Sequence, residues 1–290
     1  MTMTRVMVVT TACVLAACSA TPTGNDAGVD AGPELPTTVK VSGNVVLFPD
    51  AVAVLADAGV SFTTQGLTVR TEEPFKVAIN DPAGIFATAT LDATGTFSTA
   101  SVPVDLVTLG IAIGVRDDTS TGAPRVVRSA TSVYDVALMD GAKPAADVTS
   151  VKGYAVPLQL HDALTALITP ATIHGITGLT DAGTLIDSGF VLGRIVDASG
   201  VPVAGLTITP LGATATAAAR TARLFYPSAD LKALGSATSS NGLFVYVHTG
   251  GDVDTFQFTV AGHGEYKQRN AGAAKDACLV LPVFPGLVAP

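Results

Sequence analysis

The chain has no tryptophan, only three cysteines and few charged side chains, and these shortages narrow its function. Charged residues make up 14% of the sequence, and the acidic ones outnumber the basic ones, which gives a formal net charge of -8. A nucleic-acid interface needs clustered lysine and arginine to meet the phosphates. No such cluster with interleaved aromatic residues occurs, so we expect no nucleic-acid partner.

Common catalytic patterns are also missing. None of the four histidines has HExxH spacing, no serine lies in G-x-S-x-G, and no glycine-rich phosphate loop occurs. We therefore expect no catalytic residue, no metal site and no cofactor, and we interpret the protein as non-enzymatic. A hydrolase remains an alternative, for which the pairs His161-Asp162 and His263 with Glu265 are the candidates. A solvent-exposed or hydrogen-bonded histidine explains each pair more simply.

Three groups of acidic residues offer oxygen ligands of the kind that calcium prefers: Glu72-Glu73, Asp117-Asp118 and Asp252 with Asp254. None follows the spacing of an EF-hand loop. The solubility of exposed loops explains them better than a calcium site does.

The N-terminal segment has the order of a secretory signal peptide. Arg5 precedes the apolar run Val6 to Ala17, which is shorter than the roughly 20 apolar residues that a membrane-spanning helix needs. Leu15-Ala16-Ala17-Cys18 then resembles the lipobox of bacterial lipoproteins. This resemblance implies cleavage before Cys18, acylation of its thiol, and attachment of the protein to a membrane through the lipid. Residues 1–17 are therefore the expected signal peptide.

The residue after the lipobox cysteine bears on localisation. In the lipoproteins that this segment resembles, aspartate there favours the inner membrane, whereas this chain has Ser19. The resemblance thus implies a lipid-anchored protein of the cell envelope, at the outer membrane. Two alternatives remain open: cleavage after Ala20, with Cys18 an ordinary signal cysteine, or an uncleaved anchor.

Cysteine usage is consistent with a lipoprotein. Cys13 leaves with the signal and Cys18 carries the lipid, so Cys278 alone remains and no disulfide within the chain is expected. Cys278 lies in an apolar run, which favours a buried structural thiol over a nucleophile.

The remaining sequence predicts a tether followed by two β-rich blocks. Residues 18–36 are small, polar and turn-forming, and we interpret them as a disordered tether. Short runs of Val, Ile, Phe and Thr then alternate with turn residues, as in β-sandwiches. The strands expected in the first block, 37–156, are Val39–Leu47, Val60–Val69, Phe75–Ile79, Ile85–Leu91, Gly95–Val102, Val107–Val115 and Arg125–Leu138.

The second block, 189–290, is expected to have strands at Phe190–Asp197, Leu206–Pro210, Leu243–His248, Thr255–Ala261 and Ala277–Phe284. Between the blocks, residues 157–188 form a connector. Its apolar residues from Leu160 to Ile168 have helical spacing and Pro170 follows, which predicts a short helix. Ser228–Gly235 has a capping serine and a terminal glycine, which predicts a single helical turn.

Two pairs of similar segments suggest that the blocks are related. Asp57-Ala-Gly-Val60 parallels Asp197-Ala-Ser-Gly-Val201, and Thr94-Gly-Thr-Phe97 parallels Asn241-Gly-Leu-Phe244. The spacing is that of a domain repeat. Chance similarity in a chain rich in Ala, Gly and Thr is the alternative.

The second block resembles the carboxypeptidase regulatory-like, or transthyretin-like, domain in three segments. These are Gly193–Asp197, then Gly200-Val-Pro-Val-Ala-Gly205 as a hairpin, and later Asn241-Gly-Leu-Phe244 as a tight turn entering a strand. The resemblance implies a small β-sandwich and is silent on activity. Our expected fold is all-β: two tandem Ig-like or transthyretin-like β-sandwiches joined by a short helical connector.

These observations favour a non-catalytic, surface-anchored lipoprotein that acts as a structural or protein-interaction module of the cell envelope. Its expected partners are the membrane, through the lipid, and an envelope protein or a glycan. A glycan-binding accessory module is the alternative, for which Tyr246 and His248 could form an exposed strip on one strand.

Overall fold

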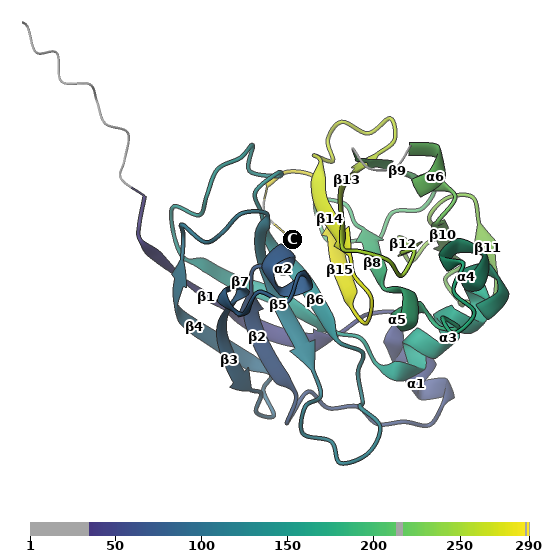
Figure 1. Ribbon diagram of the computed structural model, residues 1–290, viewed down its shortest axis with the longest axis horizontal. Helices are drawn as coiled ribbons and strands as arrows, with labels where there is room; N and C mark the ends of the chain where they lie inside the picture. The colour runs from purple at the N-terminus through teal and green to yellow at the C-terminus, as the bar shows by residue number, and fades with distance from the viewer. Residues whose placement is uncertain (1–34, 213–216, 288, 290) are drawn as a thin grey trace, which may run out of the picture. The chain divides into compact units, whose positions relative to one another are not determined.

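The first half of the chain folds into two sheets that enclose an apolar core. A computed structural model describes residues 35–212, 217–287 and 289. Strand β1 pairs antiparallel with β4 and parallel with β7, while β2, β3, β5 and β6 form the facing sheet with only antiparallel pairs (Figure 1). The bounds are β1 (Thr38–Leu47), β2 (Thr68–Glu72), β3 (Ile85–Thr90), β4 (Thr96–Pro103), β5 (Gly110–Arg116), β6 (Ser129–Asp135) and β7 (Val148–Ala155).

The second half repeats this pairing. Strand β8 pairs antiparallel with β12 and parallel with β15, and β13 pairs antiparallel with both β9 and β14. Strands β10 and β11 continue from β12 toward the sheet edge. The bounds are β8 (Phe190–Ile195), β9 (Ile208–Leu211), β10 (Leu224–Pro227), β11 (Leu234–Gly235), β12 (Leu243–Val247), β13 (Asp254–Val260), β14 (Arg269–Ala273) and β15 (Cys278–Val283).

The strand order agrees with the repeat suggested by the sequence. Strands β1, β4 and β7 pair as β8, β12 and β15 do, and β2, β5 and β6 pair as β9, β13 and β14 do. Gly95 and Gly242 precede the equivalent strands β4 and β12, and both have the positive φ (68° and 67°) that glycine adopts without strain. The equivalent third strands differ, because β3 joins β2 whereas β10 joins β12.

The two halves share one sheet. Strand β15 pairs in parallel with β8 on one side and with β6 on the other, from Cys278 opposite Ser129 to Val280 opposite Thr131. The described residues thus form a nine-stranded sheet in the order β11-β10-β12-β8-β15-β6-β5-β2-β3, with β15 between β6 and β8 in Figure 1. We call the β6–β15 junction the seam. A fold rich in β-strands with several sheets is confirmed, but the halves are not joined by the helical connector alone.

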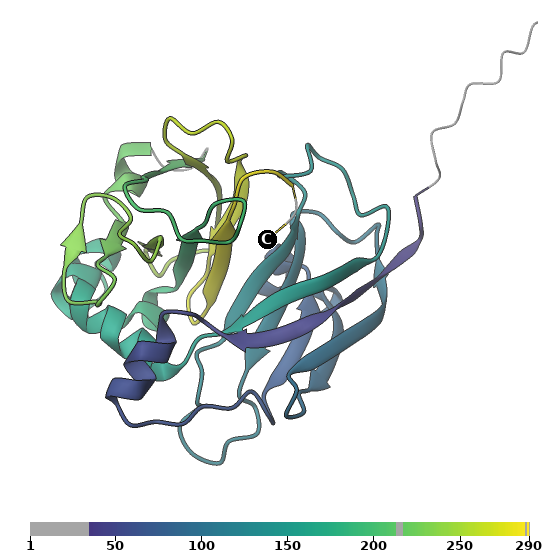
Figure 2. The ribbon, with the colours of Figure 1, turned by 180° about the vertical axis from the view of Figure 1, so that it is seen from behind.

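Helices cover the outer face of the sheet in the second half, as Figure 2 shows from behind. The expected connector helix is confirmed as α3 (Leu158–Ile168), with Leu160, Leu164 and Ile168 buried. These residues pack in one core with Phe48 of the first half and Val245 of the second. Apart from α2, which is described below, the other helices are α1 (Ala51–Asp57), α4 (Pro170–Thr177), α5 (Leu185–Ser188) and α6 (Ala217–Thr221). The connector is therefore part of the core of both halves.

One expected strand is a helix. Phe75–Ile79 alternates like a strand, but it forms α2 (Pro74–Ala78), followed by the 3-10 turn η1 (Pro82–Gly84). The Glu73 carboxylate accepts a hydrogen bond from the Lys76 backbone N–H at 2.8 Å, and Pro74 occupies the first helical turn, where its missing N–H costs nothing. The N-cap and the proline favour a helix more strongly than the short alternation of apolar and polar residues favours a strand.

Two other local expectations also failed. Ser228–Gly235 is not a helical turn, because the Ser228 hydroxyl accepts bonds from Lys232 and Ala233 in a loop that ends in β11. The segment before Thr68 is not a strand either. Pro170 ends α3 as expected, but it also begins α4, with Thr169 as the cap. Strands β7, β10, β11 and β14 and helices α1, α4, α5 and α6 were not expected.

Cys18, the signal peptide and most of the tether lie outside the described residues. The helices that the structure does describe are all too short or too polar to cross a membrane.

Candidate functional site

A cavity lies at the seam, over the outer face of the β2-β5-β6 sheet. It has a volume of about 90 Å³ and is bounded by α2 and β6 from the first half and by β14 and β15 from the second. Its walls are mainly apolar, and their principal residues are Phe75, Val77, Ala130, Ala271, Ala273 and Leu279. We call it the seam pocket.

The helical wall of the pocket is held by Glu73, which is fully buried. Besides capping α2, its carboxylate accepts hydrogen bonds from the Thr108 hydroxyl at 2.7 Å and from the Leu109 backbone N–H at 2.8 Å. The carboxylate thus fastens α2 to the segment that leads into β5. Bonds to an ionised acceptor are stronger than neutral ones, so this wall is firmly positioned.

Glu72, the last residue of β2, lines the floor of the pocket and is 3% exposed. Its carboxyl group lies against Gly114, where an added Cβ would approach the Glu72 Cδ to 2.8 Å. Only glycine leaves room for it. Among the described residues, the Glu72 Oε2 atom has no hydrogen-bond partner. A buried polar atom without a partner costs free energy and suggests an unassigned role.

Three arginines surround this carboxyl group on the same sheet face. Arg70 alternates with Glu72 along β2, Arg116 lies opposite Thr68, and Arg128 precedes β6 at the pocket wall. Burial raises the pKa of Glu72, and the arginines oppose that shift only in part. None of them forms an ion pair with Glu72 in the described structure.

Polar contacts across the seam hold the two halves in register beside the pocket. The Asp135 carboxylate accepts a bond from the Asn270 backbone N–H at 2.8 Å, and the Asn270 amide donates to the Leu109 carbonyl at 3.1 Å. Farther away, the Asn241 amide donates to Asp50 at 2.8 Å. Burial raises the pKa of Asp135.

The proposed aromatic strip is wrong. Tyr246 and His248 are 0% and 1% exposed, although an exposed surface was expected. Strand β12 is buried on both faces: Tyr246 packs against Phe256 in the core of the second sandwich, and Val245 packs beneath the helices. Sheets covered on both faces contain nearly continuous apolar strands, so alternation does not identify an exposed side. The exposed strip on which the glycan-binding alternative rested is therefore absent from this strand.

The two histidine–carboxylate pairs considered for a hydrolase both form. His161 Nδ1 lies 2.8 Å from Asp162 Oδ1, and its Nε2 accepts the Ile186 backbone N–H at 3.2 Å, so the buried ring joins α3 to α5. His263 Nδ1 lies 2.9 Å from Glu265 on the surface, and this contact lowers the pKa of Glu265.

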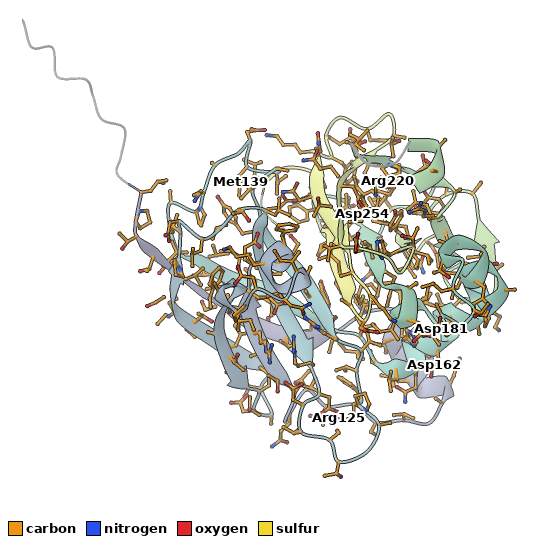
Figure 3. All side chains as sticks on the ribbon, viewed as in Figure 1. Arg125, Met139, Asp162, Asp181, Arg220 and Asp254 are labelled. Carbon is orange, nitrogen blue, oxygen red and sulfur yellow. The ribbon has the colours of Figure 1, made fainter. Side chains whose placement is uncertain are left out.

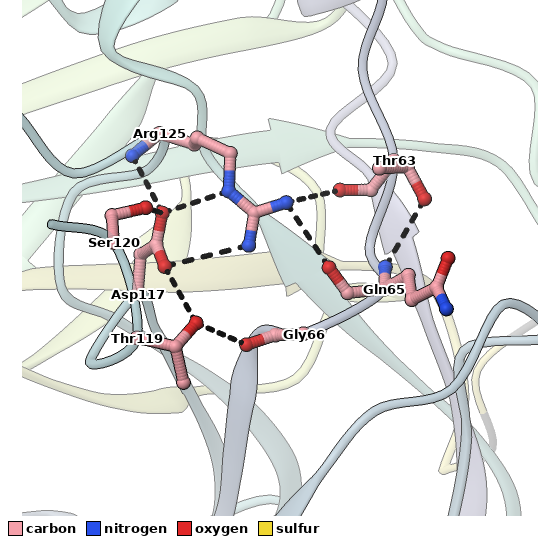
Figure 4. A network of polar contacts seen from close by, with 7 residues as sticks. All are labelled: Thr63, Gln65, Gly66, Asp117, Thr119, Ser120 and Arg125. Carbon is pink, nitrogen blue, oxygen red and sulfur yellow. Dashed lines mark hydrogen bonds and ion pairs between the residues drawn. The ribbon is translucent and has the colours of Figure 1, made fainter. Parts of the chain in front are cut away.

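Two of the acidic groups considered for calcium hold arginines instead. Figure 4 shows the buried Asp117 carboxylate accepting bonds from Arg125 Nε at 2.8 Å and from the Ser120 hydroxyl at 2.6 Å, which lowers the pKa of Asp117. Asp254 points toward Arg220 in Figure 3 and forms an ion pair with it. Across the described residues, no group of three or more potential ligands is placed to hold a metal ion.

Cys278 lies 1% exposed in β15, and burial raises the pKa of its thiol. The expectation of a buried structural cysteine is confirmed. Glu72 had been considered only as one of two loop acids. Thr68, Arg70 and Glu72 alternate along the strand and therefore lie on the same face, with the acid beside an arginine. This alternation was the one sequence signal that could have identified Glu72.

No protein-family model matches the chain, and no curated protein matches it. Solved structures show low similarity. A streptococcal ancillary pilin is 10% identical, with 86% of this chain and 69% of that chain covered and a TM-score of 0.25. The shaft pilin SpaA from Lactobacillus rhamnosus GG is 12% identical, with 88% and 100% covered and a TM-score of 0.22. A minor pilin of Streptococcus agalactiae is 9% identical, with 87% and 97% covered and a TM-score of 0.24. Scores this low assign neither fold nor role.

Proposed function

We propose that the protein is a non-catalytic lipoprotein, attached to the cell envelope through Cys18, whose folded region is a structural and protein-interaction module. The observation that carries the proposal is the continuous sheet across the seam. Its registered strand pairs, together with the core shared by both halves and α3, give the folded region the build of one rigid body. A rigid body presents a fixed surface to a partner and therefore loses less conformational entropy on binding than a flexible one.

The outer edge of β3 supplies the interaction surface. Strand β3 ends the nine-stranded sheet, and its sequence, Ile85 to Thr90, has no charged residue or proline. Unprotected edges of this kind accept an additional strand from another chain. Its last three residues are exposed, and in Figure 1 the strand lies away from the seam. We propose that an extended segment of an envelope protein pairs with this edge.

The anchor rests on the lipobox resemblance at Leu15–Cys18 and on Ser19, which favours the outer membrane. One acyl chain binds a membrane only marginally, whereas several chains hold a protein durably. The multiple acylation typical of the lipoproteins that this segment resembles would therefore attach the protein without a membrane-spanning helix.

Fractionation of Cys18→Ala tests the anchor, with Cys13→Ala as the matched control in the same apolar segment. We expect Cys18→Ala to lose metabolic labelling with palmitate and to leave the membrane fraction or accumulate unprocessed. Cys13→Ala should behave as the wild type does. Palmitate labelling that persists in Cys18→Ala would overturn the assignment of the anchor.

Crosslinking in intact cells, followed by recovery of the full chain, tests the interaction role. Ala89→Lys places a charge on the exposed end of β3, and Ala229→Lys places one in an exposed loop of the second half. We expect a discrete envelope partner with the wild type and Ala229→Lys, and its loss with Ala89→Lys. Equal recovery with both variants would exclude the β3 edge, and recovery of no partner would contradict an interaction role.

A further inference from the structure

The seam pocket combines two features that the proposed function does not use. One is an apolar cavity of about 90 Å³, lined by elements of both halves. The other is a carboxyl group in its lining, on Glu72, with one buried oxygen that has no hydrogen-bond partner. Ligand pockets commonly have apolar walls with a few convergent polar groups that orient the bound molecule.

We propose that the seam pocket binds a small neutral molecule that has an aromatic or aliphatic body and one hydroxyl or amide N–H group, which donates a hydrogen bond to Glu72. This role is separate from the lipid anchor and from the β3 edge. The apolar body would pack between α2 and β14, against Val77 and Ala273. Burial of that body and completion of the hydrogen bond both favour binding.

The charges around the pocket select against ionic ligands. A cation would meet Arg128 at the pocket wall, with Arg70 and Arg116 on the same sheet face. An anion would be attracted by these arginines and repelled by the Glu72 carboxylate, and an ion of either sign would lose its hydration in the mainly apolar pocket. A neutral donor avoids both penalties. It can pair with the carboxylate, and with the protonated acid it can exchange the roles of donor and acceptor.

The size of the cavity limits the ligand to about one ring or a short chain. Small side chains form part of the wall, including Ala130 on β6 and Ala271 and Ala273 on β14. The Glu72 Oε2 atom is itself covered. The proposal requires that a lining side chain rotates to uncover this atom for the bound donor, a motion that exposed side chains make within nanoseconds.

Binding would also stabilise the seam. The pocket wall takes Ala130 from the first half and Ala273 and Leu279 from the second, so one molecule contacts both sides. A ligand that binds only the folded protein raises the free energy of unfolding by RT ln(1 + [L]/Kd), and the unfolding temperature therefore rises with ligand concentration. This gives a second measurement that is independent of direct binding.

Four probes of similar size distinguish the chemistry: para-cresol, toluene, benzylamine and benzoate. Titrations of the full chain, followed by amide chemical shifts, should map para-cresol to residues around Ala130, Ala273 and Leu279. We expect para-cresol to bind at least about tenfold more tightly than toluene, which corresponds to one hydrogen bond to a charged or buried acceptor. Benzylamine and benzoate should bind more weakly than para-cresol, and para-cresol should raise the unfolding temperature.

Variants separate the hydrogen bond from the cavity. Glu72→Met keeps the volume and removes the acceptor, so the preference for para-cresol over toluene should fall to about twofold or less. Ala130→Leu fills the pocket and should abolish binding of both probes. Ala100→Leu, the same substitution at an exposed position on β4, should bind as the wild type does.

The proposal is overturned if para-cresol and toluene bind the wild type equally, or if benzylamine or benzoate binds most tightly. Shift changes away from the pocket, or no binding at saturating probe, would also overturn it. If Glu72→Met does not fold, Ala130→Leu against Ala100→Leu still decides whether the cavity is the site. Loss of palmitate labelling or of the crosslinked partner would leave this result unaffected.

Discussion

Asp135 at the end of β6 provides a direct test of how tightly the seam joins the two halves. Its side chain is 3% exposed, and its carboxylate accepts the Asn270 backbone N–H across the seam and the Ala137 backbone N–H locally, at 2.8 and 2.9 Å. Asp135→Ala removes both acceptors and leaves two N–H groups unpaired.

The expected cost follows from these two bonds. An orphaned buried donor costs about 1–3 kcal/mol, so the two donors together cost about 2–6 kcal/mol. Removal of a carboxylate that burial already disfavours, as its raised pKa shows, returns part of this amount. We expect Asp135→Ala to lower the free energy of unfolding by about 2–4 kcal/mol. Asp135→Asn retains a carbonyl acceptor and should lose about half as much or less.

The assay is urea denaturation combined with native-state hydrogen exchange. Asp197→Ala is the control, because Asp197 also accepts two backbone N–H bonds, from Ser199 and Val201, but in an exposed turn within the second half. It should cost about 1 kcal/mol or less, since water replaces the lost acceptor. Asp135→Ala should also speed exchange at β15, whereas Asp197→Ala should not. Equal costs for the two variants, with exchange at β15 unchanged, would refute the reasoning about the seam.

Three further results are expected. Glu72→Met should stabilise the protein by about 1–3 kcal/mol at neutral pH, because it removes a buried carboxyl oxygen that has no hydrogen-bond partner. Burial raises the pKa of Glu72, so the wild type bears the cost of burying a charged carboxylate at pH values above the pKa of the folded protein. This cost is absent below the ordinary value of 4.5. The difference in free energy of unfolding between variant and wild type, measured by urea denaturation, should therefore shrink as pH falls. Asp117→Asn should cost about 1–2 kcal/mol at pH 7, discounted because the Arg125 side chain is 34% exposed. The lowered pKa of Asp117 means that this stability is present above its ordinary value of 3.8 and is lost as pH falls below it; a cost that does not depend on pH would contradict this origin. Gly193→Ala should cost about 3 kcal/mol, because its Cβ would lie 1.9 Å from the Phe244 ring in the core, whereas Gly122→Ala, with open space around it, should leave the melting temperature unchanged.

Local pattern predicted strands where one face is buried and the other exposed. The alternation around Phe97 located β4 within one residue at each end, and helical spacing of Leu160, Leu164 and Ile168 located α3. Pattern failed where a stronger local rule competed, as in α2, where Glu73 and Pro74 start a helix within an alternating segment.

Local sequence pattern also failed where residues far away in the sequence determine whether a strand is buried. Strand β14 begins with Arg269 and Asn270, which do not resemble a buried strand. Arg269 stacks on Phe284 at 3.9 Å, and Asn270 bonds to Asp135, far away in sequence. Likewise, the face that carries Tyr246 is buried by strand β13, and the opposite face by helices. The sequence of β12 itself does not indicate that other elements bury both of its faces.

The seam itself has no local signature, because parallel pairing at three positions of β6 and β15 depends on the placement of whole sandwiches. For the same reason, the seam pocket could not be predicted from sequence. Its polar member, Glu72, was visible only as an acid beside another acid, and its apolar wall comes from segments more than one hundred residues apart.

The central claim is that the seam makes the folded region one rigid body, and a distance distribution across it tests this most directly. Spin labels at Ala89→Cys on β3 and Ala229→Cys beyond β10 would be placed in the full chain with Cys13 and Cys18 replaced by serine. The buried Cys278 thiol, with its raised pKa, should not react. Electron paramagnetic resonance should give one narrow distance peak, which Asp135→Ala broadens. A broad distribution in the parent variant would contradict the claim.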